Sequence, residues 1–140
     1  MFLSSEQIKK AIEAGDLIIS SFLEDNLKPA SYNFTLDSVL KDPVSGKEIT
    51  ISEQGYKLAP GAFILGRTKE TVNLNNKFIC ILSTRSSLAQ KGVDVLQSST
   101  IAEPDTDGQF KLEISNRGNR EVVLMPGERI VKGIFSPIRY

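Results

Sequence analysis

The sequence predicts a mainly β fold of the sandwich, jelly-roll or barrel kind, and three observations support that prediction. Only one segment has a strong helical pattern, and many short apolar or alternating runs follow it. Turn-forming residues separate these runs. No linker or low-complexity segment divides the chain, so we expect residues 1–140 to form one domain with a substantial buried core. The expected strands are LIIS (17–20), SYNFTL (31–36), AFILG (62–66), KFICILS (77–83), VDVL (93–96), QFKLEIS (109–115), EVVLM (121–125) and RIVKGIF (129–135).

The first element is an amphipathic helix at the N-terminus. Ser4 and Gln7 have the spacing of a capping box, in which each side chain satisfies a backbone N–H of the first turn. Ile8 and Ala11 fall on one helical face, and Gly15 is a natural stop after about three turns.

Two of the expected strands carry distinct burial patterns. QFKLEIS alternates, with Phe110, Leu112 and Ile114 on one face and Glu113 among the polar residues of the other. FICIL (78–82) is apolar throughout, so we expect both of its faces to be covered.

Two segments repeat a turn pattern, KLAPGAFILG (57–66) and VLMPGERIVKG (123–133). Each places Leu-x-Pro-Gly before a strand, and Pro-Gly suits the centre of a type II turn. We interpret this repeat as architectural. DPVSGKEIT (42–50) is expected to be an exposed hairpin tip.

Composition excludes several partners. The chain has 17 basic and 17 acidic residues, which argues against broad electrostatic capture of a nucleic acid polymer. The single cysteine, Cys80, is expected to be a buried thiol, as fits a cytoplasmic protein. The start lacks the apolar region of a signal peptide, and no run reaches 18 apolar residues, so we expect no membrane span.

The absence of histidine narrows the possible chemistry. Ser-His-Asp and Cys-His catalysis are excluded, and a zinc deaminase site would need His or Cys ligands that the chain does not have. An enzyme of this composition must move protons with Asp, Glu, Lys, Tyr or water.

The segment TRSSLAQKG (84–92) is the first candidate site. Arg85 offers a planar fork of donors for phosphate oxygens, and Ser86 and Ser87 add hydroxyls. A short helix near 86–91 would add free backbone N–H groups. The alternative, which the local pattern alone favours, is that the serines cap a helical turn and Arg85 makes an internal ion pair.

Two further candidates lie on the strand 109–115 and on the loop before it. Glu113 is either a general base facing a cleft or part of a solvated face beside Lys111. The segment STIAEPDTDGQF (99–110) is either a substrate-binding hairpin or an ordinary acidic loop. Its acidic residues lack the EF-hand spacing for calcium.

The order and spacing of five blocks resemble the dCTP deaminase branch of the dUTPase-like superfamily over almost the whole chain. The blocks are FLSSEQIKKAIEAGDLIISSF, LKPASYNFTLDS, KLAPGAFILGRTKETVNL, TRSSLAQKGVDV and LEISNRGNREVVLMPGERI. The hairpin from Val95 to Gly108 matches the deaminase length, and Leu112-Glu113 matches the Leu-Glu pair typical of deaminases.

The resemblance implies a distorted β-barrel or jelly roll of the β-clip type, assembled as a homotrimer with active sites between subunits. It implies a pyrimidine deoxynucleotide triphosphate as substrate, with Mg²⁺ bound through the triphosphate and no zinc. Glu113 would activate water for attack on cytosine C4, and Ser86 would help to hold the base and the water. Arg85 and Ser87 would bind phosphate, and the Ser99 carbonyl would orient the water.

Several positions depart from the family pattern. Gln90 replaces a second arginine that supports deamination, and a neutral amide cannot supply that charge. Glu103 replaces an aspartate near the deoxyribose, Thr106 an aromatic residue and Asn33 an aspartate. The sequence ends at Tyr140, soon after the last expected strand, so we expect the C-terminal segment that closes over the triphosphate in family enzymes to be truncated.

Three functions therefore remain open on the sequence. The first is a dCTP deaminase-like hydrolase that uses Glu113. The second is a dUTPase-like pyrophosphatase in which Glu103 orients water, which Lys91 in LAQKG supports. The third is a trimer without catalysis that binds a nucleotide or serves in assembly.

Overall fold

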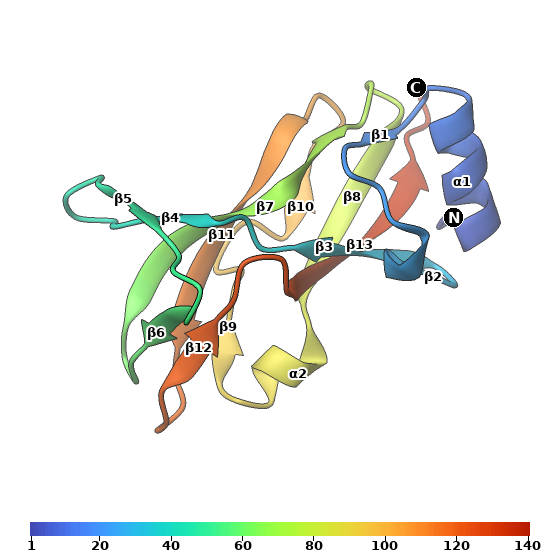
Figure 1. The fold of residues 1–140 in the computed structure, drawn as a ribbon. Coiled ribbons are helices and arrows are strands. Elements are labelled where there is room, and N and C mark those ends of the chain that lie inside the picture. Colours follow the sequence, from blue (N-terminus) through green and yellow to red (C-terminus); the bar gives the residue numbers. More distant parts are fainter.

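The computed structural model describes residues 1–140 and confirms a mainly β fold with two short α-helices. Two larger antiparallel sheets pack across one core of 30 buried apolar residues and form a distorted, open sandwich (Figure 1). The N- and C-terminal ends lie at the same end of the molecule (Figure 1).

The first sheet carries the longest strand pairing. Its order is β5-β4-β7-β11-β9, and β1 also pairs with β7. The strands are β1 (Ile18–Ile19), β4 (Val39–Lys41), β5 (Glu48–Thr50), β7 (Phe63–Asn73), β9 (Val93–Asp94) and β11 (Asp107–Asn116). β4 and β5 form the predicted hairpin, and Val44 at its tip is 95% exposed.

The second sheet closes the other side of the core. Its order is β10-β8-β13-β3-β2, and a short 3-10 helix, η1 (Glu24–Asn26), precedes β2. The strands are β2 (Leu27–Lys28), β3 (Ser31–Thr35), β8 (Phe78–Thr84), β10 (Ile101–Ala102) and β13 (Arg129–Pro137).

The predicted repeat of Pro-Gly turns is architectural. β6 (Tyr56–Leu58) and β12 (Val122–Leu124) lead into the two turns and pair with each other as a separate two-stranded sheet. Gly61 and Gly127 have φ values of 81° and 82°, the left-handed conformation that the third position of a type II turn requires.

Both helices lie where the sequence places them. α1 (Ser5–Glu13) has the expected capping box between Ser4 and Gln7. α2 (Ser86–Ala89) is a single turn, two residues shorter than expected, and Gln90 is its C-cap. Neither helix has the length and apolar composition needed to cross a bilayer.

Two local expectations about strands were wrong in part. β7 continues seven residues beyond the expected end at Gly66. In β8 only one face is fully covered, because Phe78, Cys80 and Leu82 are buried while Ile81 is 37% exposed. Cys80 is a buried thiol, as expected, and burial raises its pKa.

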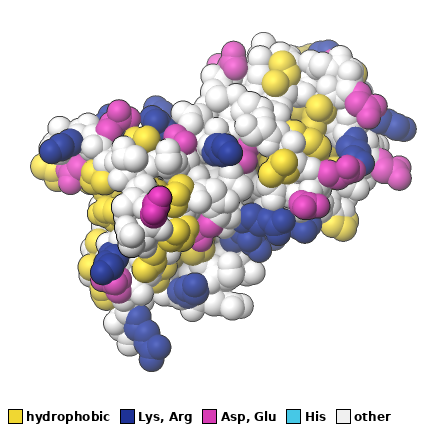
Figure 2. All heavy atoms as spheres, viewed as in Figure 1, with side chains coloured by type: hydrophobic (Ala, Val, Ile, Leu, Met, Phe, Trp, Pro, Cys, Tyr) yellow, Lys and Arg dark blue, Asp and Glu magenta, His cyan; other side chains and the backbone are white.

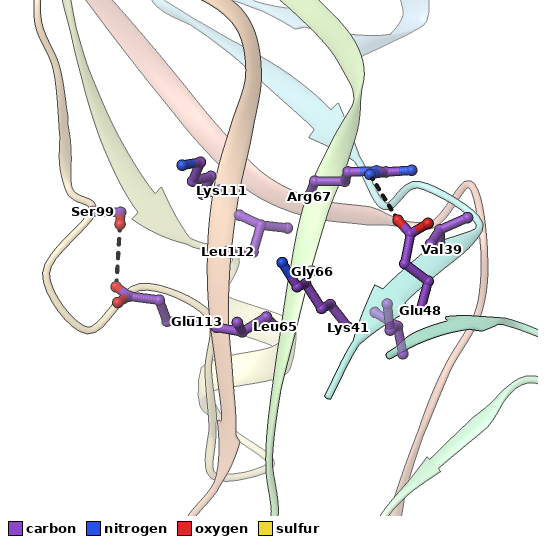
Figure 3. A pocket seen from close by; sticks show the side chains of 11 residues that line it. Val39, Lys41, Glu48, Leu65, Gly66, Arg67, Ser99, Lys111, Leu112 and Glu113 are labelled. Carbon is purple, nitrogen blue, oxygen red and sulfur yellow. Dashed lines mark hydrogen bonds and ion pairs between the residues drawn. The ribbon is translucent and has the colours of Figure 1, made fainter. Parts of the chain in front are cut away.

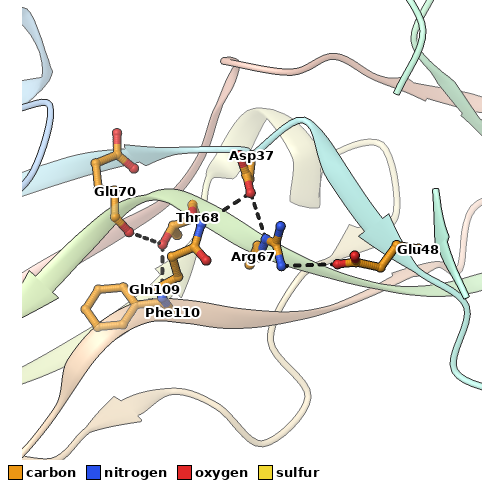
Figure 4. Close-up of polar contacts among 7 residues, drawn as sticks. All are labelled: Asp37, Glu48, Arg67, Thr68, Glu70, Gln109 and Phe110. Carbon is orange, nitrogen blue, oxygen red and sulfur yellow. Dashed lines mark hydrogen bonds and ion pairs between the residues drawn. The ribbon is translucent and has the colours of Figure 1, made fainter. Parts of the chain in front are cut away.

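β7 contains a bulge, and Figure 4 shows the contacts of Thr68 that stabilise it. Between the pairs Gln109–Thr71 and Lys111–Arg67, three residues of β7 lie opposite one residue of β11. The hydroxyl of the fully buried Thr68 fills the gap: it accepts the Phe110 N–H at 3.0 Å and donates to the Glu70 carbonyl oxygen at 2.9 Å.

The bulge turns the buried Glu70 side chain towards the second sheet. Its carboxylate accepts the backbone N–H of Thr35 at 2.9 Å and the Thr35 hydroxyl at 2.7 Å. An isolated backbone bridge between Leu36 and Thr68 lies beside this contact. The rings of Phe34 and Phe110 meet across the core at 5.0 Å in an edge-to-face arrangement.

We predict that Thr68→Val lowers the free energy of unfolding by about 1–3 kcal/mol, because the buried Phe110 N–H loses its acceptor. Thr71→Val, on the same strand but exposed, should change it by less than about 0.5 kcal/mol. Urea unfolding followed by circular dichroism measures both. Equal stability of Thr68→Val and the wild type would show that the hydroxyl does not support the bulge.

Candidate functional site

β11 presents Glu113 to a surface cavity of about 340 Å³. Leu112 and Ile114 point into the core, so strand alternation turns Glu113 to the outer face, as the sequence predicts. Leu65 of β7 lies directly opposite Glu113, and Lys41 of β4 lies beyond Leu65 in the same cross-strand row. The cavity is lined by residues that include Glu113, Ser99, Lys111, Leu65, Arg67 and Lys41 (Figure 3).

Two serines hold the carboxylate of Glu113. The Ser98 N–H donates to Oε1 at 2.9 Å, and the hydroxyls of Ser98 and Ser99 lie 3.3 and 3.2 Å from the same oxygen. Oε2 has only a long contact of 3.5 Å, to the Ser98 hydroxyl. The bond from the Ser98 backbone N–H is the main reason that the pKa of Glu113 lies below its ordinary value.

Basic side chains surround this carboxylate. Lys111 leaves the same side of β11 as Glu113 (Figure 3) and lies directly opposite Arg67 on β7. Arg67 is neutralised by Asp37, with Nε 2.7 Å from Oδ2, and by a longer contact to Glu48. Lys111 makes no ion pair, so one free ammonium lies beside the candidate base.

The Arg85-Ser86-Ser87 block lies on α2, away from this cavity. Arg85 is the N-cap residue of α2, and its side chain makes neither a capping hydrogen bond nor an ion pair. Ser86 and Ser87 are exposed, and none of the three residues lines the Glu113 cavity. The structure therefore does not support an internal ion pair for Arg85, and no hydrogen bond or shared cavity joins Arg85 to Glu113 within one chain.

Gln90 lines a different cavity of about 530 Å³. Lys91, Arg120 and Asn119 line the same cavity, because the turn after α2 packs against the turn between β11 and β12. The Arg117 N–H donates to the Gly92 carbonyl oxygen at 2.8 Å across this junction. Gln90 itself is neutral, but two cations lie beside it.

In the loop before β11, Ser99 contacts Glu113, whereas Glu103 does not. Ser99 faces Glu113 through its hydroxyl, whereas the sequence suggested a role for its backbone carbonyl. Glu103 is exposed, and its only hydrogen bond is from the Thr106 N–H to its backbone carbonyl. Thr106 lines a small cavity that also includes Ser99 and Lys111.

Sequence reasoning did not single out Ser98, and it gave Lys111 only a solvated role. The alternation of β11 could have identified Lys111, because it lies two residues before Glu113 on the same face. No local pattern identifies Ser98, since its contact with Glu113 joins residues 15 positions apart.

No three side chains of His, Cys, Asp or Glu converge to form a metal site in this chain.

Solved structures share this fold. A 2'-deoxycytidine 5'-triphosphate deaminase from Agrobacterium tumefaciens aligns over 96% of this chain with a TM-score of 0.78 and 19% identity. Our chain spans about half (47%) of that protein's chain. A dUTPase from Streptococcus mutans aligns over 89% of our chain with a TM-score of 0.56 and 19% identity. These similarities establish the dUTPase-like fold.

Curated relatives are more similar in sequence. A "dCTP deaminase, dUMP-forming" from Coprothermobacter proteolyticus is 33% identical over 97% of our chain and 82% of its own length. A "dCTP deaminase" from Natronomonas pharaonis is 31% identical over 99% of our chain and 82% of its own length. The family model described as "dCTP deaminase-like" matches residues 2–137. This chain therefore belongs to the dCTP deaminase-like family.

Proposed function

We propose that this protein is a hydrolase that deaminates dCTP to dUTP without zinc, with Glu113 activating the attacking water. The observation that carries the proposal is the Glu113 carboxylate, fixed by two serines at the wall of a cavity of about 340 Å³. The names of the Coprothermobacter proteolyticus and Natronomonas pharaonis relatives support the substrate.

The chemistry needs one proton acceptor and positive charge nearby. The Glu113 carboxylate takes a proton from water and passes it to cytosine N3 as the hydroxide adds to C4. The proton of the new hydroxyl then moves to the amino group, the C4–N4 bond breaks, and ammonia leaves as the C4 carbonyl forms. A glutamate is ionised at neutral pH, as a base requires, and the hydrogen bonds that lower the pKa of Glu113 favour that form. The free Lys111 ammonium at the same cavity stabilises the anionic character that develops as the hydroxide attacks.

We propose that the triphosphate binds to the Arg85-Ser86-Ser87 block. Arg85 supplies a guanidinium without an acidic partner, Ser87 a hydroxyl, and Ser86 a hydroxyl for the base and the water. Lys91 and Arg120 supply positive charge beside Gln90, where the side chain itself is neutral. A Mg²⁺ ion on the triphosphate would neutralise phosphate charge. Glu103 is proposed to lie near the deoxyribose.

We propose a homotrimer in which each site combines two chains. Within one chain no hydrogen bond or shared cavity joins Arg85 to Glu113, which supports a site that a second copy completes. The second sheet offers an apolar row for such contacts: Ile101, Ile81 and Ile134 are cross-strand partners on β10, β8 and β13. Ile101 is 55% exposed and Ile81 is 37% exposed.

We also propose a cytoplasmic location and no polymeric nucleic acid partner. The single thiol, Cys80, is buried and unpaired, as suits a reducing compartment. Basic and acidic side chains are interspersed over the face in Figure 2, apart from one local basic group near its centre.

A second candidate function is dUTP hydrolysis to dUMP, alone or after deamination. The Coprothermobacter proteolyticus relative is named as dUMP-forming, which favours it. Glu103, exposed in the loop before β11, would orient the water on phosphorus.

A product assay by mass spectrometry tests both functions, using dCTP and dUTP separately with Mg²⁺. We expect dUTP from dCTP. The product dUMP from dCTP would add the second reaction, and dUMP from dUTP alone would replace the first. No product from either, in folded protein, would leave a nucleotide-binding or assembly protein.

We predict that Glu113→Gln lowers kcat for deamination by roughly 10²- to 10⁴-fold, because glutamine cannot accept the proton. The Kd for dCTP should change little, since the amide oxygen still accepts the Ser98 N–H. Glu53→Gln, an exposed residue without hydrogen bonds or ion pairs, is the matched control. Wild-type activity in Glu113→Gln would refute the assigned base.

We predict that Arg85→Ala weakens dCTP binding by roughly 10- to 100-fold, because charge-assisted hydrogen bonds to phosphate are lost. Binding of deoxycytidine, which has no phosphate, should be unaffected. Isothermal titration calorimetry with both ligands, and with Arg139→Ala as control, measures this difference. Unchanged dCTP affinity would make Arg85 a structural residue.

We predict that mixing Glu113→Gln chains with Arg85→Ala chains restores activity that neither variant has alone. After subunit exchange, roughly a quarter of intersubunit sites would combine an intact Glu113 with an intact Arg85. Co-expression with two affinity tags, followed by the deamination assay, tests it. Activity that never exceeds that of the separate variants would place both residues in one chain's site.

A further inference from the structure

The two oxygens of the Glu113 carboxylate have unequal surroundings. Oε1 lies within hydrogen-bond distance of three donors, the Ser98 N–H at 2.9 Å and the hydroxyls of Ser99 and Ser98 at 3.2 and 3.3 Å. Oε2 has one contact, at the 3.5 Å limit, with the Ser98 hydroxyl. Because Ser98 has only one hydroxyl proton, its shorter contact to Oε1 leaves Oε2 without a close donor.

The segment that carries these serines is tied down on both sides. Glu113 donates its own N–H to the Val95 carbonyl oxygen at 2.9 Å. Asp94 Oδ1 accepts the Leu96 N–H at 3.0 Å and the Thr84 hydroxyl at 3.2 Å. The serines are therefore held against the carboxylate by contacts to β8, β9 and β11, and their position does not depend on Glu113 alone.

No charged side chain forms an ion pair with either oxygen of Glu113. Lys111 on β11, Arg67 on β7, Lys41 on β4 and Glu48 on β5 line the same cavity, and none of them is hydrogen bonded to Glu113. From β9, Asp94 lies opposite Ser115, two residues along β11. Only the serine segment contacts the carboxylate directly.

We propose that Ser98 and Ser99 are positioning residues for Glu113: they occupy Oε1 and leave Oε2 as the oxygen that takes the proton from the attacking water. The inference rests on the proposed function, and it adds two residues that act through Glu113. Fixing one oxygen sets the rotation of the carboxylate, so the lone pairs of Oε2 face the reacting water. The same bonds stabilise the ionised form, in line with the lowered pKa of Glu113.

The test compares wild type with Ser98→Ala/Ser99→Ala and with Ser98→Thr/Ser99→Thr, which retains both hydroxyls. Ser115→Ala is the control, because Ser115 lies on the same strand as Glu113 and its buried hydroxyl makes no hydrogen bond. In the alanine pair, kcat should fall roughly 10- to 100-fold with little change in KM. The acidic limb of the pH profile should move slightly to higher pH, because the two hydroxyl donors are lost while the Ser98 N–H, the main donor, remains. The threonine pair should have a kcat and an acidic limb close to those of the wild type.

A second measurement does not require activity. Carbon-13 NMR titration of the Glu113 carboxyl should give a higher midpoint in the alanine pair than in the wild type, the threonine pair or Ser115→Ala. Identical midpoints and pH profiles in all four folded proteins would overturn the positioning role. No deamination by the wild type, with the midpoint still shifted, would overturn the proposed function but keep the assignment of the serines as the donors to Glu113.

Discussion

The bulge in β7 is the constraint on which the arrangement of the two sheets depends. A regular β7–β11 ladder would keep Glu70 in line with its neighbours. The extra residues, stabilised by Thr68, instead turn a buried carboxylate towards Thr35 of the other sheet. A buried carboxylate without partners would be strongly destabilising, so the two Thr35 bonds are a condition of this fold. The sheets are joined here by polar contacts as well as by the apolar core.

The same bulge sets the register of the functional strand. Beyond it, Lys111, Leu112 and Glu113 pair regularly with β7, so the core residue and its two polar neighbours have fixed directions. Glu113 is thus placed by the rigid part of the sheet, while its hydrogen-bond donors come from the loop after β9.

The sequence predicted correctly the elements that depend on residues close together in the chain. The Ser4–Gln7 capping box, the two Pro-Gly turns and the alternation around Glu113 follow from neighbouring residues, and the structure contains all of them. The length of β7 did not follow, because its bulge and its charged residues interrupt the alternating pattern. The half-exposed β8 did not follow either, since an apolar run does not reveal which face has a neighbour.

In the candidate site, too, only the features that depend on neighbouring residues could be predicted. Strand alternation is enough to turn Glu113 outwards, but the contact with Ser98 depends on the tertiary path of residues 95–99. Arg85, Ser86 and Ser87 were recognised from the order of the blocks, and the structure places them on one helical turn. In the proposed trimer, their position relative to Glu113 depends on how the chains assemble, which a local pattern does not determine.

The pairing of β6 with β12 has a consequence for the order in which the chain folds. These strands are nearly half the chain apart, and the segment between them contains β7, β8, β9 and β11. Closing such a long loop costs conformational entropy that only the contacts inside it can offset. The pairing of the two Pro-Gly strands therefore depends on the β7–β11 ladder, whose shorter loop brings them close.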